Sequence, residues 1–152
     1  MHSMKSGRNS EKGQYGAGDT KRRKGRNMRS LKAETFEDLL VWQKAMNLVE
    51  SIYRECRNGS LAKDFGLRDQ LQRTAVSIAA NIAEGYERAT RKEYVHFLAI
   101  AKGSAGELRC LIQVGQRVQH LNESKSEEFI HQVTEISRML KGLTQSLKPG
   151  RS

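Results

Sequence analysis

Cysteines are scarce in this chain, and the sequence has no long apolar run. Its two cysteines, Cys56 and Cys110, stand far apart, which excludes a metal centre built from paired cysteines and the disulfide framework of a small secreted protein. No apolar run approaches the roughly 20 residues that a membrane span needs. The first residues also lack the apolar stretch of a signal peptide. We therefore expect a cytoplasmic protein that has no contact with a membrane.

Residue patterns that organise catalysis are also nearly absent. The spacing Glu-x-x-His occurs twice, as in di-iron carboxylate bundles, which use two such pairs and two further glutamates. The residues concerned would be Glu50, Glu84, Glu93, His96, Glu128 and His131. Such a site requires side chains that project into the bundle, whereas His96 and His131 should point away from the apolar faces of their helices. His2 and His120 have no evident partner. The sequence therefore predicts a protein that is not an enzyme and that holds no metal or cofactor.

Positive charge is concentrated in the first 32 residues. This segment carries ten Lys or Arg residues against two acidic residues, a net charge of +8, whereas Ala33–Ser152 has a net charge of +2. With scarcely an apolar residue, residues 1–32 cannot bury enough surface to offset the entropy of ordering, so we expect a disordered basic tail.

Six cations of the tail lie within nine residues, which is typical of an arm that seeks phosphate groups. They are Lys21, Arg22, Arg23, Lys24, Arg26 and Arg29. Two simpler interpretations stay open. The tail could be a solubilising extension, or it could reflect the choice of start codon, since Met4 and Met28 could each begin a shorter chain.

Apolar periodicity predicts four long helices connected by short links. They should cover about Thr35–Arg57, Phe65–Arg88, Thr90–Leu121 and Ser124–Leu147. Thr90 with Glu93, and Ser124 with Glu127, have the spacing of capping boxes. The sequence therefore predicts an all-α fold: an antiparallel up-down four-helix bundle over residues 33–148, followed by a short C-terminal tail at 149–152.

Two further stripes refine the predicted packing. The core face of the first helix should be Leu39, Trp42, Met46, Val49, Ile52 and Cys56. In the third helix a stripe of small residues consists of Ala99, Gly103, Gly106 and Cys110. Because an interior glycine costs about 1 kcal/mol relative to alanine, we expect close helix packing in compensation. Replacing Gly106 with leucine should then force two helices apart.

The second helix is apolar on two sides and therefore needs two partners. Beyond its core face it carries Val76, Ala79, Ala80 and Ala83, which should face a tightly packed helix or another subunit. A polar seam runs between the two faces at Thr74, Ser77, Asn81, Glu84 and Arg88. The seam either makes specific hydrogen bonds, with Asn81 and Glu84 as the candidate interface residues, or is a solvated flank.

Four blocks of the sequence resemble a known family. They are Phe36–Ala45, Leu67–Ile78, Asn81–Gly85 and Glu93–Leu98, in order and at suitable distances. Over about Phe36–Leu147 the chain resembles the four-helix bundle family encoded by intervening sequences in bacterial 23S ribosomal RNA genes. It is more remotely similar to the accessory proteins of diversity-generating retroelements, which are basic pentameric bundles that bind reverse transcriptase and nucleic acid. The resemblance implies a cytosolic homopentamer, associated with nucleic acid and without known catalysis.

These observations together favour a non-enzymatic oligomeric bundle that binds RNA or DNA. The binding residues would be those of the basic tail together with Arg88, Arg91 and Lys92 on the bundle. The alternative is a protein-binding scaffold or accessory subunit whose basic tail is incidental.

Overall fold

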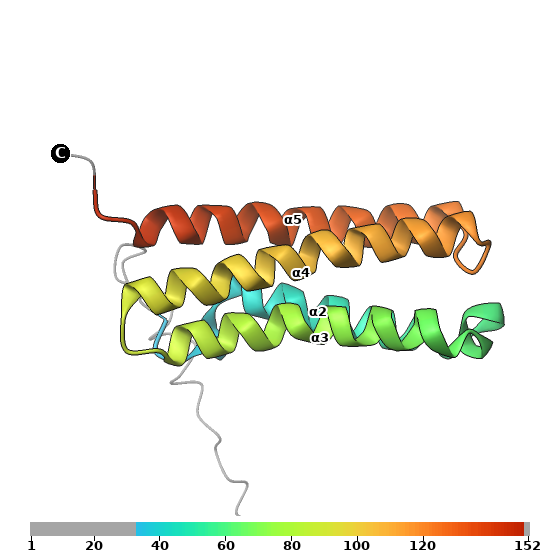
Figure 1. Ribbon diagram of the computed structural model, residues 1–152, viewed down its shortest axis with the longest axis horizontal. Coiled ribbons are helices and arrows are strands. Elements are labelled where there is room, and N and C mark those ends of the chain that lie inside the picture. Colours follow the sequence, from blue (N-terminus) through green and yellow to red (C-terminus); the bar gives the residue numbers. More distant parts are fainter. Residues whose placement is uncertain (1–32, 151–152) are drawn as a thin grey trace, which may run out of the picture. The chain divides into compact units, whose positions relative to one another are not determined.

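Four long helices form the part of the chain that the computed structural model describes, residues 33–150 (Figure 1). The elements in order are the short 3-10 helix η2 (Phe36–Asp38), α2 (Leu40–Glu55), the 3-10 helix η3 (Gly59–Lys63), α3 (Phe65–Glu87), α4 (Arg91–Arg117) and α5 (Glu123–Leu147). Residues 33–150 contain no strand. The predicted all-α four-helix bundle is confirmed. Residues 1–32, for which we expected a disordered tail, lie outside the described residues.

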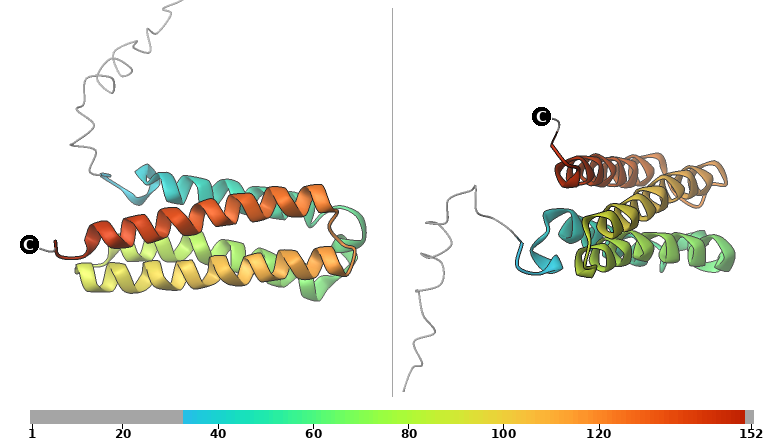
Figure 2. Two further views of the ribbon diagram at one scale, coloured as in Figure 1. Left: turned by 90° about the horizontal axis from the view of Figure 1, so that it is seen from above. Right: turned by 60° about the vertical axis from the view of Figure 1, so that its left-hand side comes forward.

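The helices lie side by side and alternate in direction (Figures 1 and 2). α3 turns into α4 at one end of the bundle, while η3 and the link between α4 and α5 lie at the other end. The contact between α3 and α4 is the most extensive of the bundle, and α2 packs less extensively against α3 and α5. The α3–α4 hairpin is therefore the central unit to which α2 and α5 are added.

Capping residues explain where the later helices begin. At α4, Thr90 Oγ1 accepts the Glu93 N–H at 3.2 Å, as the predicted capping box requires. At α5 the prediction was wrong: Asn122 is the cap, its Oδ1 accepts the Lys125 N–H at 2.7 Å, and Ser124 lies inside the helix. Leu121 is buried immediately upstream, which fixes the chain so that Asn122 is the first residue free to cap.

The start of the first helix also differs from the prediction. Thr35 precedes the 3-10 turn η2, the backbone is extended at Leu39 (ψ 121°), and the α-helix begins only at Leu40. One carboxylate oxygen of Asp38 accepts the backbone N–H groups of Glu34 (3.1 Å) and Thr35 (3.2 Å). Asp38 therefore stabilises a separate turn that precedes the helix.

This offset changes which face of α2 lies in the core. The buried stripe is Val41, Ala45, Leu48, Ile52 and Cys56. Ile52 and Cys56 were predicted correctly, but Trp42, Met46 and Val49 are only partly buried and lie on the neighbouring flank. Apolar residues cover a wide arc of α2, so periodicity alone could not decide which stripe faces the other helices.

The small-residue stripe of α4 does not pack inside the bundle. Gly106 is exposed, and a Cβ atom added there would meet no heavy atom within 4 Å. The prediction that leucine at Gly106 would force helices of the bundle apart is therefore wrong. Leu98, Ala105 and Leu108 occupy the inner face of α4 and turn the stripe outward. Close approach occurs instead at Gly85, where a Cβ would lie 2.9 Å from Phe97 Cβ.

Candidate assembly groove and basic surface

An open apolar depression lies between α2 and α3, and we call it the apolar groove. It has a volume of about 320 Å³. It is lined by Phe36, Trp42, Met46, Val49, Val76, Ala79, Ala80 and Ala83. The rings of Phe36 and Trp42 meet edge to face at one end, with centroids 5.3 Å apart. The groove is thus bounded by the partly buried flank of α2 that we predicted to be its core face and by the second apolar side of α3.

The residue sizes explain why a groove forms here. The three alanines of α3 provide a low floor, because a methyl group fills little of the space between two helices. Trp42 and Met46 supply a wall from α2. Ala79 is buried, whereas Val76 stays 40% exposed. An exposed apolar patch of this kind marks a binding surface more often than isolated exposed apolar residues do.

The polar seam of α3 makes hydrogen bonds at the junction with α4. Ser77 Oγ lies 2.8 Å from Ser104 Oγ on α4. Asn81 Nδ2 donates to the Ser77 carbonyl at 2.8 Å and lies 3.0 Å from Ser77 Oγ. Thr74 is buried in the same seam. Asn81 therefore bonds within α3, next to the contact of Ser77 with α4, and does not line the apolar groove.

The three basic residues predicted to bind nucleic acid on the bundle, Arg88, Arg91 and Lys92, lie where α3 turns into α4, and all three are exposed. Arg88 is already engaged: its Nη2 lies 2.5 Å from Glu84 Oε1, and its guanidinium lies 4.7 Å from the centre of the Phe97 ring. Within residues 33–150, no ion pair joins Arg91 or Lys92 to an acid. These two cations are therefore better placed than Arg88 to meet a phosphate.

The six cations of the predicted tail lie outside the described residues. The first described residue, Ala33, accepts a hydrogen bond through its carbonyl from Tyr86 Oη, near the end of α3. Ala33 thus lies at the end of the bundle that carries Arg91 and Lys92.

His120 has partners that sequence reasoning missed. Its Nδ1 lies 2.7 Å from Ser60 Oγ on η3, and its Nε2 lies 3.0 Å from Asp64 Oδ2. The other oxygen of Asp64 accepts the Leu67 N–H at 3.1 Å and so caps α3. Gln119, just before His120, has a left-handed backbone (φ 65°) that turns the chain toward these partners. The three side chains join the two connections at one end of the bundle.

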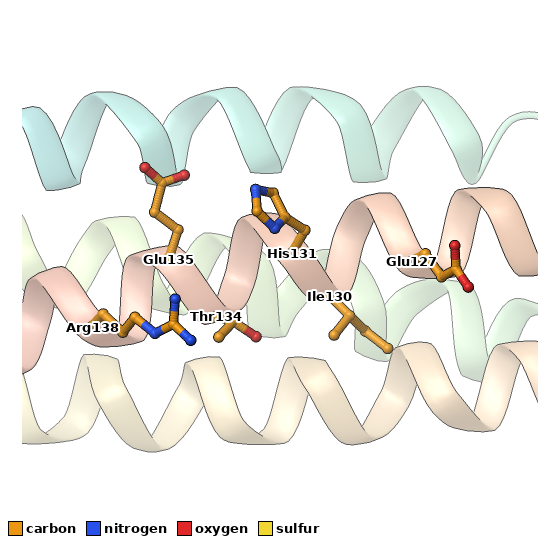
Figure 3. A pocket seen from close by; sticks show the side chains of 6 residues that line it. All are labelled: Glu127, Ile130, His131, Thr134, Glu135 and Arg138. Atoms are coloured by element: carbon orange, nitrogen blue, oxygen red, sulfur yellow. The ribbon is translucent and has the colours of Figure 1, made fainter.

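The histidines of the Glu-x-x-His pattern are exposed and lie on different helices. Figure 3 shows His131 on α5, where it lines an open depression together with Thr134 and Glu135. Nearby Glu135 Oε1 pairs with Lys44 Nζ at 2.9 Å, and this hydrogen bond lowers the pKa of Glu135. Among the described residues, no group of three or more His, Cys, Asp or Glu side chains is arranged to hold a metal ion. No helix in this part of the chain is long and apolar enough to cross a membrane.

Comparison with known proteins identifies the family. No curated protein matches the chain. A crystal structure of a protein with unknown function from the S23 ribosomal protein family of Bacteroides thetaiotaomicron VPI-5482 is similar, with 25% sequence identity and a TM-score of 0.65. The match covers 70% of this chain and 99% of that one. The family model of the 23S rRNA-intervening sequence protein matches residues 37–142. Neither comparison indicates an enzyme family, and the chain belongs to the 23S rRNA-intervening sequence protein family.

Proposed function

We propose that the protein is a non-enzymatic, oligomeric four-helix bundle of the cytoplasm that binds RNA or DNA through electrostatic contacts. One observation carries the proposal: charge and apolar surface are separated along the chain. Residues 1–32 have a net charge of +8, whereas Ala33–Ser152, with a net charge of +2, forms the bundle that bears the apolar groove. The first part suits a polyanion, and the second suits a protein surface.

The nucleic-acid part of the proposal rests on the six cations between Lys21 and Arg29. Each can displace a condensed counterion from a phosphate backbone, and the sequence of this segment carries no groups that would read bases. Arg91 and Lys92 add two exposed cations at the end of the bundle where Ala33 lies. We therefore expect binding with little sequence preference.

The assembly part rests on the apolar groove. Trp42, Met46 and Val76 stay partly exposed there, although a monomeric protein would gain free energy by covering them. We propose a homo-oligomer, and a pentamer on the strength of the family resemblance.

The test replaces all six tail cations with glutamine in the full chain. Wild-type protein should lose affinity as salt rises, with a slope of log K against log salt of up to about −5 on duplex DNA and about −4 on single strands. The six-fold variant should lose most of this slope and remain an oligomer. A control variant with glutamine at Arg88, Arg91 and Lys92 should keep most of it. Unchanged affinity and slope in the six-fold variant would refute binding through the tail.

The groove also favours a second candidate, a protein-binding scaffold whose basic tail is incidental. The two candidates differ in a simple observation, the ratio of absorbance at 260 and 280 nm after purification. A preparation that is free of nucleic acid and binds none in titrations would support the scaffold.

A further inference from the structure

We propose that the apolar groove of one copy receives the outward face of α4 from a second copy, so that the chain assembles head to tail. This inference deepens the proposed self-assembly and rests on it. We call the outward face the α4 ridge and define it by Ile100, Gly103, Cys110 and Val114.

The α4 ridge is an exposed, partly apolar surface of the bundle that the groove could accept. Ile100 is 38% exposed and Val114 is 41% exposed, although both are large apolar residues. Cys110 lies between them and is exposed. Around Gly103 a Cβ atom would meet nothing within 4 Å. A narrow ridge with apolar side chains at its ends suits a groove whose floor consists of alanines.

The groove and the ridge are different surfaces, so their contact is heterologous. The groove lies between α2 and α3, whereas the ridge lies on the side of α4 opposite its core stripe. A heterologous contact closes into a ring when its rotation closes, and otherwise gives a filament. If the rotation axis runs along the bundle, each helix keeps its direction, and residues at the same height in neighbouring copies meet.

The heights can be taken from contacts within one copy. Ser77 on α3 meets Ser104 on α4, and Val76 lines the groove together with Val49 on α2. Glu107 lies about one turn beyond Ser104, and Arg73 lies about one turn before Ser77. Because α3 and α4 are antiparallel, Glu107 and Arg73 lie at the same height.

Opposite charges therefore meet when the ridge of one copy enters the groove of the next. Glu107 beside the ridge would face Arg73 on the α3 rim of the groove. On the other flank, Lys102 lies within about one turn of Glu50, which follows Val49 on the α2 rim. All four side chains are exposed within the single copy. Arg54 and Arg57, farther along the rim, have no such acid opposite them, so the charge pairing is confined to the middle of the groove.

A cysteine introduced beside the groove tests the contact in the full chain. Cys110 lies at the height of Tyr53 and Arg54, which line a neighbouring depression that shares Val49 and Val76 with the groove. Oxidised Tyr53→Cys or Arg54→Cys protein should form a ladder of dimers, trimers and larger covalent species. The ladder should disappear when Cys110→Ser is added. The buried Cys56 should not interfere, and Glu128→Cys on α5 serves as a control that should give no ladder.

The outcomes separate this inference from the proposed assembly. Covalent dimers that persist with Cys110→Ser would show groove-to-groove contact and overturn the inference. Absence of a ladder from both variants, while light scattering shows that they remain oligomers, would also overturn it. A wild-type monomer at micromolar concentration would instead refute self-assembly as such.

Charge reversal gives a second measurement that does not depend on disulfide geometry. Glu107→Arg and Arg73→Glu should each weaken assembly several-fold, because each places like charges opposite one another. The double variant should recover most of the loss. Additive losses in the double variant would contradict the proposed contact.

Discussion

Gly85 determines how closely the end of α3 approaches the start of α4. A Cβ atom at this position would lie 2.9 Å from Phe97 Cβ and 3.0 Å from Tyr94 Cδ2. Neither ring can move without disturbing the hairpin, because Tyr94 packs on the core and against the ring of Tyr86. This position needs glycine for space, since its backbone is ordinary helix.

We expect Gly85→Ala to lower the free energy of unfolding by about 1 to 3 kcal/mol, as overpacking of a closed interface does. Gly142→Ala is the matched control: this helical glycine is exposed and has open space, so alanine should stabilise the protein by up to about 1 kcal/mol. Urea unfolding followed by circular dichroism measures both. Equal stability of Gly85→Ala and wild type would show that α3 and α4 separate easily.

The two cysteines should differ sharply in reactivity. Burial raises the pKa of Cys56 from 9.0 to about 11, whereas Cys110 is exposed. At pH 8 a thiol reagent should therefore modify one cysteine of the native protein rapidly and the second only after unfolding. Two rapid modifications at pH 8 would contradict the structure. Self-assembly that covers Cys110 would slow its reaction at high protein concentration.

The same pKa shift predicts how stability depends on pH. Between pH 9 and 11 the unfolded chain releases the Cys56 proton and the folded protein keeps it, so the free energy of unfolding falls as pH rises through this window. Burial raises the pKa of Tyr94 from 10.0 to about 12, which extends the decline. Urea midpoints at pH 8 and pH 10.5 measure the effect, and Cys56→Ala should reduce it. An equal loss in Cys56→Ala would assign the decline to other groups.

At the scale of the helices, the start of α5 offers a paired test of the cap. Asn122→Ala should cost about 1 kcal/mol, because it leaves the Lys125 N–H without its acceptor. Ser124→Ala should have little effect, since Ser124 is exposed within the first turn. Unfolding midpoints of the two variants give the answer. A larger loss of stability for Ser124→Ala than for Asn122→Ala would instead support Ser124 as the cap of α5, as predicted from the sequence.

The helices could be predicted because their signals are local. The cap at Thr90 and the four apolar stretches each depend on residues a few positions apart, and all are found in the structure. The start of α5 was misplaced because two residues suited to capping stand two positions apart, and burial of Leu121 decides between them.

The features that were missed depend on residues far apart in the chain. His120 contacts Ser60 and Asp64, which are more than 50 residues away in the sequence. No local sequence pattern around any of the three residues predicts these contacts. The glycines show the same limit. Gly106 and Gly85 are both glycines within predicted helices, and only the position of the neighbouring helix shows that Gly85 is closely packed and Gly106 is not. The second apolar side of α3 could be predicted from the sequence, but the residues of α2 that complete the apolar groove could not.

For the whole molecule, Trp42 provides a direct signal of assembly. It is the single tryptophan of the chain and lines the apolar groove. If a second copy fills the groove, diluting the protein should shift the Trp42 emission to longer wavelength as the ring becomes hydrated. The shift should follow the same concentration dependence as the mass measured by light scattering. Emission that stays constant while the mass falls would place the subunit contact elsewhere.

The modest packing of α2 gives the groove a further consequence. α2 supplies one wall of the groove, yet it contacts its neighbours less extensively than α3 contacts α4. A partner in the groove would add contacts to α2, the long helix with the fewest contacts to the others. The packing of α2 on the bundle and the binding of a partner in the groove are then linked equilibria. By mass action, the local opening of α2 would then become rarer as protein concentration rises, while the α3–α4 hairpin would be little affected. The cell could thus regulate the integrity of one helix through the abundance of the protein alone.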